Sequence, residues 1–361
     1  MKQRLDKLRQ ALKEKNIDAL LVSNFYNILY LSGFKTLTEN EREGWMLVTT
    51  RKSYLFSDSR YLNLKTQNLN GKSTSQILKL ITPETGLIKH LQGIFQEEGI
   101  KTCGVEADDL KIFEFEQLKK YLPETKFIPT EKLIIKQRET KDETEIEKIK
   151  KACEIADQCL KETLYLIKVG KTEKEIAFKI EFWLKEKNYD MAFYPIVAVD
   201  ENSAVPHYDT RNGDNKKVKN GSVILIDFGA KYENYLSDIT RMIFVGKPNN
   251  EMLETYKKLQ KIQNLTTAHL EDGMATKEVD EFCRKKITYP HSTGHGVGLE
   301  IHEYPKISFT STETLHKNQV VTIEPGVYFE GKWGMRIEDT VLVKENGVEV
   351  LTKFSKDLLV L

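Results

Sequence analysis

Four carboxylates and one histidine in this sequence have the residue types and the settings of a metal centre. They are Asp227, Asp238, His295, Glu324 and Glu338. An apolar residue adjoins each acid, and an ionised carboxylate in apolar surroundings is costly unless a cation neutralises it. Two divalent ions would balance four carboxylates, and oxygen ligands with one nitrogen favour Mn²⁺, Co²⁺, Fe²⁺ or Zn²⁺. Such a centre would acidify a bound water enough for it to serve as hydroxide near neutral pH.

Histidines gather around the same segments. Four of the seven in the chain are His207, His291, His295 and His302. Any single acid or histidine is more simply a solvated, salt-bridged or core residue, but that interpretation does not account for all of them together. Glycines at 294, 296 and 298 allow the backbone to approach a ligand closely. The clustering therefore supports a chemical site independently of the acids.

Two hairpins are expected to position the acids. An apolar run at 222–228 carries Asp227 near its end, and a second run at 239–245 begins directly after Asp238. If residues 229–237 connect two antiparallel strands, the two aspartates lie near each other.

The second pair of acids has a similar arrangement. An apolar run at 320–323 leads into Glu324, a glycine-containing turn is expected at 330–334, and a strand at 336–343 would carry Glu338. Each hairpin would then present two carboxylates to one site.

The remaining chain divides into two parts. Alternating helix and strand signals in the first third predict a small α/β domain over residues 1–130, followed by a second domain over 131–361. Thr140 with Glu143 predicts a capping box at the start of a long helix, and Thr172 with Glu175 repeats this signature.

Bulk composition fits a soluble globular protein of two domains, with 361 residues, 40% hydrophobic and 30% charged. Because the net charge is +1 and both signs are mixed along the chain, neither nucleic acid nor a membrane is expected as a partner. Charges occupy the place where a signal peptide needs an apolar core, and no membrane span is predicted. The four cysteines lack Cys-x-x-Cys spacing, so idle thiols and a cytoplasmic location are expected.

These motifs resemble those of the pita-bread metallopeptidases, and within them the Xaa-Pro dipeptidases (prolidases) and Xaa-Pro aminopeptidases. The resemblance covers essentially the whole chain. It rests on the ten residues between Asp227 and Asp238, the thirteen between Glu324 and Glu338, and the histidine-rich segment 291–303. It implies an α+β chain, in which a small creatinase-like N-terminal α/β domain precedes a C-terminal pita-bread metallopeptidase domain, and it implies a homodimer.

The resemblance also implies a ligand set for two divalent metal ions per chain, manganese first, with cobalt or zinc as alternatives. Asp227 would chelate one ion, Asp238 and Glu338 would bridge both, and His295 and Glu324 would complete the second. A hydroxide bridging the two ions would attack the carbonyl that precedes proline.

Further positions match catalytic and substrate-binding residues of the family. Glu324 would take the proton of the attacking water, His302 would contact the scissile carbonyl, and His207 matches an upstream active-site histidine. The implied substrate-binding and supporting residues are His291, Lys306, Tyr328 and Arg336.

The expected function is a manganese-dependent dipeptidase (prolidase) that hydrolyses Xaa-Pro peptides. The alternatives are an Xaa-Pro aminopeptidase acting on longer peptides and, from another class, a non-catalytic binding protein on the same fold. Methionine aminopeptidases typically lack the N-terminal domain, creatinase-like hydrolases lack the full ligand set, and binding relatives have generally lost metal ligands.

The sequence departs from the family pattern in three places. Val199-Asp200 stands where many members have a small residue and glycine, and the connection 284–291 is shorter than usual. Lys306 stands where prolidases commonly carry an arginine that holds the carboxylate of a dipeptide. Lysine keeps the charge but lacks the two-pronged geometry of arginine, so the preferred peptide length stays open.

Overall fold

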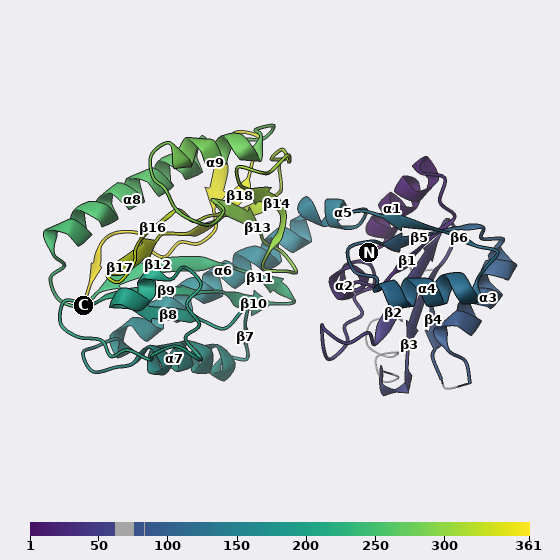
Figure 1. The fold of residues 1–361 in the computed structure, drawn as a ribbon, viewed down its shortest axis with the longest axis horizontal. Helices are drawn as coiled ribbons and strands as arrows, with labels where there is room; N and C mark the ends of the chain where they lie inside the picture. The colour runs from purple at the N-terminus through teal and green to yellow at the C-terminus, as the bar shows by residue number, and fades with distance from the viewer. Residues whose placement is uncertain (62–75, 83) are drawn as a thin grey trace. The chain divides into compact units, whose positions relative to one another are not determined.

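The computed structural model describes residues 1–61, 76–82 and 84–361, which form two compact units, Met1–Arg138 and Glu139–Leu361 (Figure 1). The division comes later than the boundary expected after residue 130. A guanidinium nitrogen of Arg138 donates to Asn27 Oδ1 at 2.8 Å, and this contact holds the segment after residue 130 in the first unit.

The first unit is an α/β domain. Its sheet has the strand order β4 (Gln76–Leu80), β3 (Ser53–Ser57), β2 (Gly44–Thr49), β1 (Ala19–Val22), β5 (Thr102–Glu106) and β6 (Lys126–Thr130). Strand β2 runs antiparallel to β1 and β3, and the other neighbouring strands are parallel. The helices are α1 (Lys2–Glu14), α2 (Phe25–Ser32), α3 (Leu87–Glu98), α4 (Ile112–Tyr121) and α5 (Ile135–Glu139).

The second unit combines several sheets with long helices. One sheet has the order β20 (Leu359–Val360), β12 (Ile239–Phe244), β9 (Val223–Phe228) and β8 (Ile196–Val199). Another has the order β14 (Glu303–Ile307), β13 (Gly294–Gly296), β15 (Val320–Ile323), β18 (Asp339–Val343) and β19 (Val348–Val350). Smaller sheets pair β16 (Gly326–Phe329) with β17 (Trp333–Arg336), and β10 (Ala230–Tyr232) with β7 (Asp190–Met191) and β11 (Tyr235–Leu236).

Helices cover both sides of these strands. They are α6 (Glu143–Thr163), α7 (Glu173–Glu186), α8 (Asn250–His269) and α9 (Thr276–Arg284). Helix α7 lies on the opposite side of the strands from α8 and α9 (Figure 1), and α6 packs against α7, β10 and β11. The predicted α+β class is confirmed by this architecture.

The long helix α6 begins two residues later than the sequence predicts. Its capping box uses Asp142, which accepts a hydrogen bond from the Glu145 amide at 3.0 Å, while Glu145 accepts from the Asp142 amide at 2.9 Å. Thr140 is not the cap because its backbone forms an isolated β-bridge with Gln319. The capping box predicted for α7 is confirmed.

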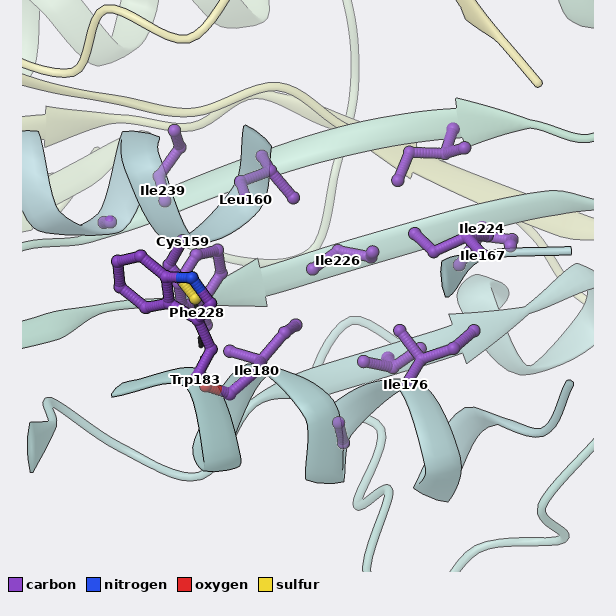
Figure 2. Close-up of a cluster of buried hydrophobic side chains, with 14 of the residues drawn as sticks. Cys159, Leu160, Ile167, Ile176, Ile180, Trp183, Ile224, Ile226, Phe228 and Ile239 are labelled. Atoms are coloured by element: carbon purple, nitrogen blue, oxygen red, sulfur yellow. Dashed lines mark hydrogen bonds between the residues drawn. The ribbon is translucent and has the colours of Figure 1, made fainter. Parts of the chain in front are cut away.

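The apolar faces of α6 and α7 fix the orientation of strand β9. Successive side chains of a strand point to opposite faces. Ile224, Ile226 and Phe228 therefore face the core formed with these two helices (Figure 2). Asp227 alternates with them, so its carboxylate points to the other face, where the candidate site lies.

The described residues include no helix that is both long and apolar enough to cross a membrane. All four cysteines are buried free thiols, and burial raises the pKa of Cys103 to about 12.

Candidate active site

The first predicted hairpin is present and brings its two aspartates to one end. Strands β9 and β12 are antiparallel, with Asp227 opposite Thr240 and Phe228 opposite Ile239. Asp238 stands immediately before β12. The connection itself folds into the short strands β10 and β11, which pair with each other.

The second pair of acids is arranged differently from the prediction. The expected strand at 336–343 is interrupted at Ile337 and Glu338, because β17 pairs with β16 whereas β18 pairs with β15. At the interruption the Glu338 amide donates to the Thr240 carbonyl at 3.2 Å. Glu338 therefore lies where both strand pairs meet the end of β12.

His295 faces the acids from β13. Its Nε2 lies 3.4 Å from Glu324 Oε1 and 3.6 Å from Asp238 Oδ2. Its Nδ1 lies 3.1 Å from the Gly296 carbonyl, and such a contact orients a ligating imidazole. One ligand atom from each of Asp238, His295 and Glu338 lies within 4.8 Å of the others.

Asp227 joins the same site through two supporting side chains. Arg336 donates to Asp227 Oδ2 at 2.6 Å and to Thr240 Oγ1 at 3.1 Å. Thr240 in turn donates to Glu338 Oε2 at 2.6 Å. Arg336 was predicted from the sequence, but Thr240 was missed. Thr240 lies two residues after Asp238, and on β12 this position puts its side chain on the same face of the sheet as Asp227.

Burial and mutual repulsion disfavour ionisation of this cluster. Burial, followed by the charges of neighbouring acids, raises the pKa of Asp238 and of Glu338 well above the usual range. Burial raises the pKa of Glu324 to about 7. Burial, with the charge of His302, lowers the pKa of His295 to about 3, so its imidazole is neutral and available as a ligand.

Divalent cations fit these residues. Asp227 Oδ1 and Asp238 Oδ1 are buried, and neither has a hydrogen-bond partner in the part of the chain that the structure describes. A buried acceptor without a partner is costly, and a cation would satisfy both oxygens and offset the repulsion. The donor set of carboxylate oxygens and one imidazole nitrogen suits a transition-metal ion.

We expect the stabilisation of the protein by Mn²⁺ to grow as the pH rises from about 5 to about 8. The pKa of Glu324 is raised in the folded protein from its ordinary 4.5 to about 7. Its protonated carboxyl group therefore stabilises the metal-free protein fully below pH 4.5, and this stabilisation is lost as the pH rises through about 7. The pKa of His295 is lowered from 6.5 to about 3, so its effect is opposite and reduces stability as the pH falls below 6.5.

Mn²⁺ binding requires ionised acids and a neutral imidazole, so affinity should rise by up to about tenfold per pH unit for each displaced proton. Thermal melts of EDTA-treated protein, with and without Mn²⁺ across this pH range, measure the difference. An equal shift in Tm at both ends would contradict the expectation.

The acids open into a cavity of about 750 Å³. Among its lining residues His207, His302 and Lys306 are exposed. Lys306 stands opposite His295 in the β13–β14 pairing. Partial desolvation of the His302 ring lowers its pKa even though the residue is exposed, and the charges of His207 and Lys306 add to this effect.

The two other predicted pocket residues contact each other. His291 lines the cavity, and its Nε2 lies 2.8 Å from the Tyr328 hydroxyl. That hydroxyl also accepts a hydrogen bond from Arg336 at 3.0 Å. Burial, with the charge of Arg336, lowers the pKa of His291 to about 4. Tyr328 therefore acts as a link between the pocket wall and the acids.

Part of the cavity wall was not predicted. Phe193 and Tyr194 line it, and the guanidinium of Arg211 lies 5.2 Å from the centre of the Tyr194 ring. Arg211 also pairs with Asp209 at 3.0 Å. These residues carry no chemical motif of their own, and their positions on either side of His207 in the sequence were the available signal.

Comparison with known proteins supports the same fold and chemistry. Residues 147–345 match metallopeptidase family M24, and residues 4–140 match the Creatinase/Prolidase N-terminal domain. An Xaa-Pro dipeptidase of Pyrococcus horikoshii is 33% identical, over 99% of both chains.

Two solved structures extend the comparison. An Xaa-Pro dipeptidase from Bacillus anthracis has a TM-score of 0.90 and 33% identity, covering 99% of both chains. An X-Pro aminopeptidase from Thermotoga maritima has a TM-score of 0.86 and 35% identity, covering 96% of this chain and 98% of that one. The predicted resemblance and the predicted hydrolase class are confirmed. The chain belongs to metallopeptidase family M24 and carries a Creatinase/Prolidase N-terminal domain.

Proposed function

We propose that the protein is a dinuclear metal-dependent Xaa-Pro dipeptidase, with Mn²⁺ as the first candidate metal. The observation that carries the proposal is the buried group of carboxylates with His295, open to a cavity whose other residues include three further histidines. The named dipeptidases at 33% identity over nearly the whole length support the same substrate class. A cytoplasmic homodimer stays an expectation from the sequence.

The five ligands proposed for the two cations are Asp227, Asp238, His295, Glu324 and Glu338. When bound, divalent cations supply Lewis acidity and lower the pKa of a water molecule towards neutrality. Arg336 and Thr240 would keep Asp227 and Glu338 in place, through the hydrogen bonds already described.

The chain's own groups would move the protons. Glu324 would accept the proton of the attacking water, because its carboxylate lines the cavity beside His295, with Oε1 3.4 Å from the imidazole Nε2. The same carboxyl group would return a proton to the proline nitrogen, which must be protonated to leave. His302 would donate a hydrogen bond to the carbonyl oxygen as negative charge develops there, and His207 would contact the substrate from the exposed side of the cavity.

An Xaa-Pro aminopeptidase is the second candidate, and Lys306 favours it. A dipeptide places its C-terminal carboxylate next to the reacting bond, where a bidentate arginine would hold it better than lysine. The similarity to an X-Pro aminopeptidase at 35% identity is compatible with this alternative. A non-catalytic binding protein is disfavoured, because such a protein has no need of the complete set of acids and histidines.

Two peptides distinguish these candidates. Protein loaded with Mn²⁺ is incubated with Leu-Pro and with Leu-Pro-Gly, and the released leucine is quantified. Cleavage of Leu-Pro supports the dipeptidase, whereas cleavage of the tripeptide alone rejects it in favour of the aminopeptidase. Wild-type protein that neither binds metal nor cleaves either peptide would point to the binding protein.

Lys306→Ala should raise the KM for Leu-Pro about tenfold and have less effect on Leu-Pro-Gly, because a charge-assisted hydrogen bond contributes about 1.5 kcal/mol or more. Lys306→Arg should lower the KM for the dipeptide. Lys332→Ala, at an exposed turn, is the matched control. Equal changes in KM for both peptides would refute a contact between Lys306 and the substrate carboxylate.

A further inference from the structure

A side chain of helix α9 spans the short connection that leads to His291. Arg284 is the last residue of α9. Its Nη1 donates to the Tyr289 carbonyl at 2.7 Å, and its Nη2 donates to the His291 carbonyl. The guanidinium carbon also lies 4.4 Å from the centre of the Tyr289 ring. The connection that is shorter than the family pattern is therefore held by one two-pronged side chain.

Arg284 is fixed from behind by a buried carboxylate. Asp280 has no exposed surface and accepts a hydrogen bond from Arg284 Nε at 2.7 Å. Its other oxygen accepts from the Thr293 hydroxyl at 2.6 Å. The Thr293 carbonyl accepts from the Glu324 amide at 2.9 Å. Asp280 therefore anchors the segments on both sides of His291, and through Thr293 it reaches the backbone of Glu324.

The imidazole of His291 has its own contacts at the cavity. Its Nε2 lies 2.8 Å from the Tyr328 hydroxyl, and its Nδ1 lies 2.8 Å from the Ser292 carbonyl. These contacts fix the orientation of the imidazole ring only if the backbone of His291 is itself held in place. Arg284 supplies that fixed point, because the carbonyl it holds belongs to His291 itself.

We propose that Arg284, held by Asp280, is a positioning residue that sets the orientation of His291 in the substrate cavity. The proposal rests on the proposed function for its kinetic consequence, but not for its structural one. Lysine at position 284 would keep the ion pair with Asp280 but lacks the second prong, so it cannot hold both carbonyls at once. A misplacement of about 1 Å in a substrate-positioning group can reduce the rate on the order of 100-fold.

The test compares Arg284→Lys with wild-type protein loaded with Mn²⁺. We expect kcat/KM for Leu-Pro and Leu-Pro-Gly to fall about 10- to 100-fold, mainly through KM, with unchanged metal content. In metal-free protein, which gives no paramagnetic broadening, the nitrogen resonances of the His291 ring should also shift in nuclear magnetic resonance spectra. Lys277→Met, which removes an exposed ion pair with Glu281 on the same helix, is the matched control and should change neither quantity.

A second variant distinguishes a change in the orientation of His291 from a general loss of folding. Arg284→Met with Asp280→Asn leaves no unpaired buried charge, and it should reproduce the shift of the His291 resonances while the circular dichroism stays that of wild type. Unchanged ring resonances and a kcat/KM within about twofold in Arg284→Lys would overturn the positioning role. If wild-type protein cleaves neither peptide, the proposed function fails, while the ring resonances still decide whether Arg284 positions His291.

Discussion

Asp238→Asn is expected to abolish peptide hydrolysis and, in the absence of metal, to make the protein more stable. Asp238 is 4% exposed and lies among Glu338, Asp227 and Glu324, whose charges together with burial raise its pKa. Folding of the metal-free chain must therefore protonate this acid or bury its charge. An amide of the same shape removes that cost, with a gain of about 1.4 kcal/mol for each unit by which folding raises the pKa of the acid.

Although Asp238→Asn should stabilise the metal-free protein, it should lower the rate of peptide hydrolysis. The contribution of bound cations to a hydrolytic transition state is several kcal/mol, and about 4 kcal/mol corresponds to roughly a 1000-fold loss of rate. The measurements are metal content, the Tm of EDTA-treated and Mn²⁺-loaded protein, and Leu-Pro hydrolysis. Asp357→Asn, an exposed carboxylate outside the cavity, serves as the control. A metal-free Asp238→Asn protein that melts below metal-free wild type would contradict the repulsion argument.

Lys141→Met should cause a large loss of stability. Lys141 Nζ lies 3.1 Å from Glu303 Oε2, and the two side chains are 1% and 5% exposed. The other Glu303 oxygen accepts from the amides of Leu299 and Glu300 at 2.9 and 3.1 Å. Removal of the lysine takes a cation at 3.1 Å away from a buried carboxylate, at a cost of about 3–5 kcal/mol. For a unit of this size we expect Tm to fall by on the order of 10 °C.

A second substitution separates charge from hydrogen bonding. Adding Glu303→Gln to Lys141→Met removes the buried charge but keeps an oxygen for the two amides, so most of the stability should return. Adding Glu303→Leu instead should not restore it, because both amides lose their acceptor. Thermal and urea unfolding measure the difference. If the glutamine double variant is no more stable than Lys141→Met, the loss does not come from the buried charge of Glu303.

The placement of the acids was predictable from sequence where short apolar runs carry the information. The run 222–228 placed Asp227 near the end of a strand, and the antiparallel pairing of β9 with β12 was expected from the two apolar runs on either side of residues 229–237. The break of the strand at Ile337 was not predictable, because it arises from two different strand pairings. Strand β17 pairs with β16 and β18 pairs with β15, and residues near the break do not determine these pairings.

Long-range contacts explain the other omissions. Lys141 and Glu303 are 162 residues apart, and nothing near either residue in the sequence indicates the pairing. Asp200 also has partners distant in sequence, because it accepts hydrogen bonds from the Ser222 hydroxyl at 2.9 Å and from the Val223 amide at 3.0 Å. Asp200 thus ties the segment that precedes His207 to the start of β9.

The bridge between Thr240 and Glu338 bears on the order of events during folding. These residues are 98 positions apart, and their backbone and side-chain hydrogen bonds join the β9–β12 hairpin to the strands that carry Glu338. Closing so long a loop is entropically costly, and contacts of this separation slow folding. Neither hairpin alone holds all the acids, so affinity for metal arises only after both have formed and docked. Newly synthesised chains would therefore acquire their cations late, and loss of this one contact would release them early during unfolding.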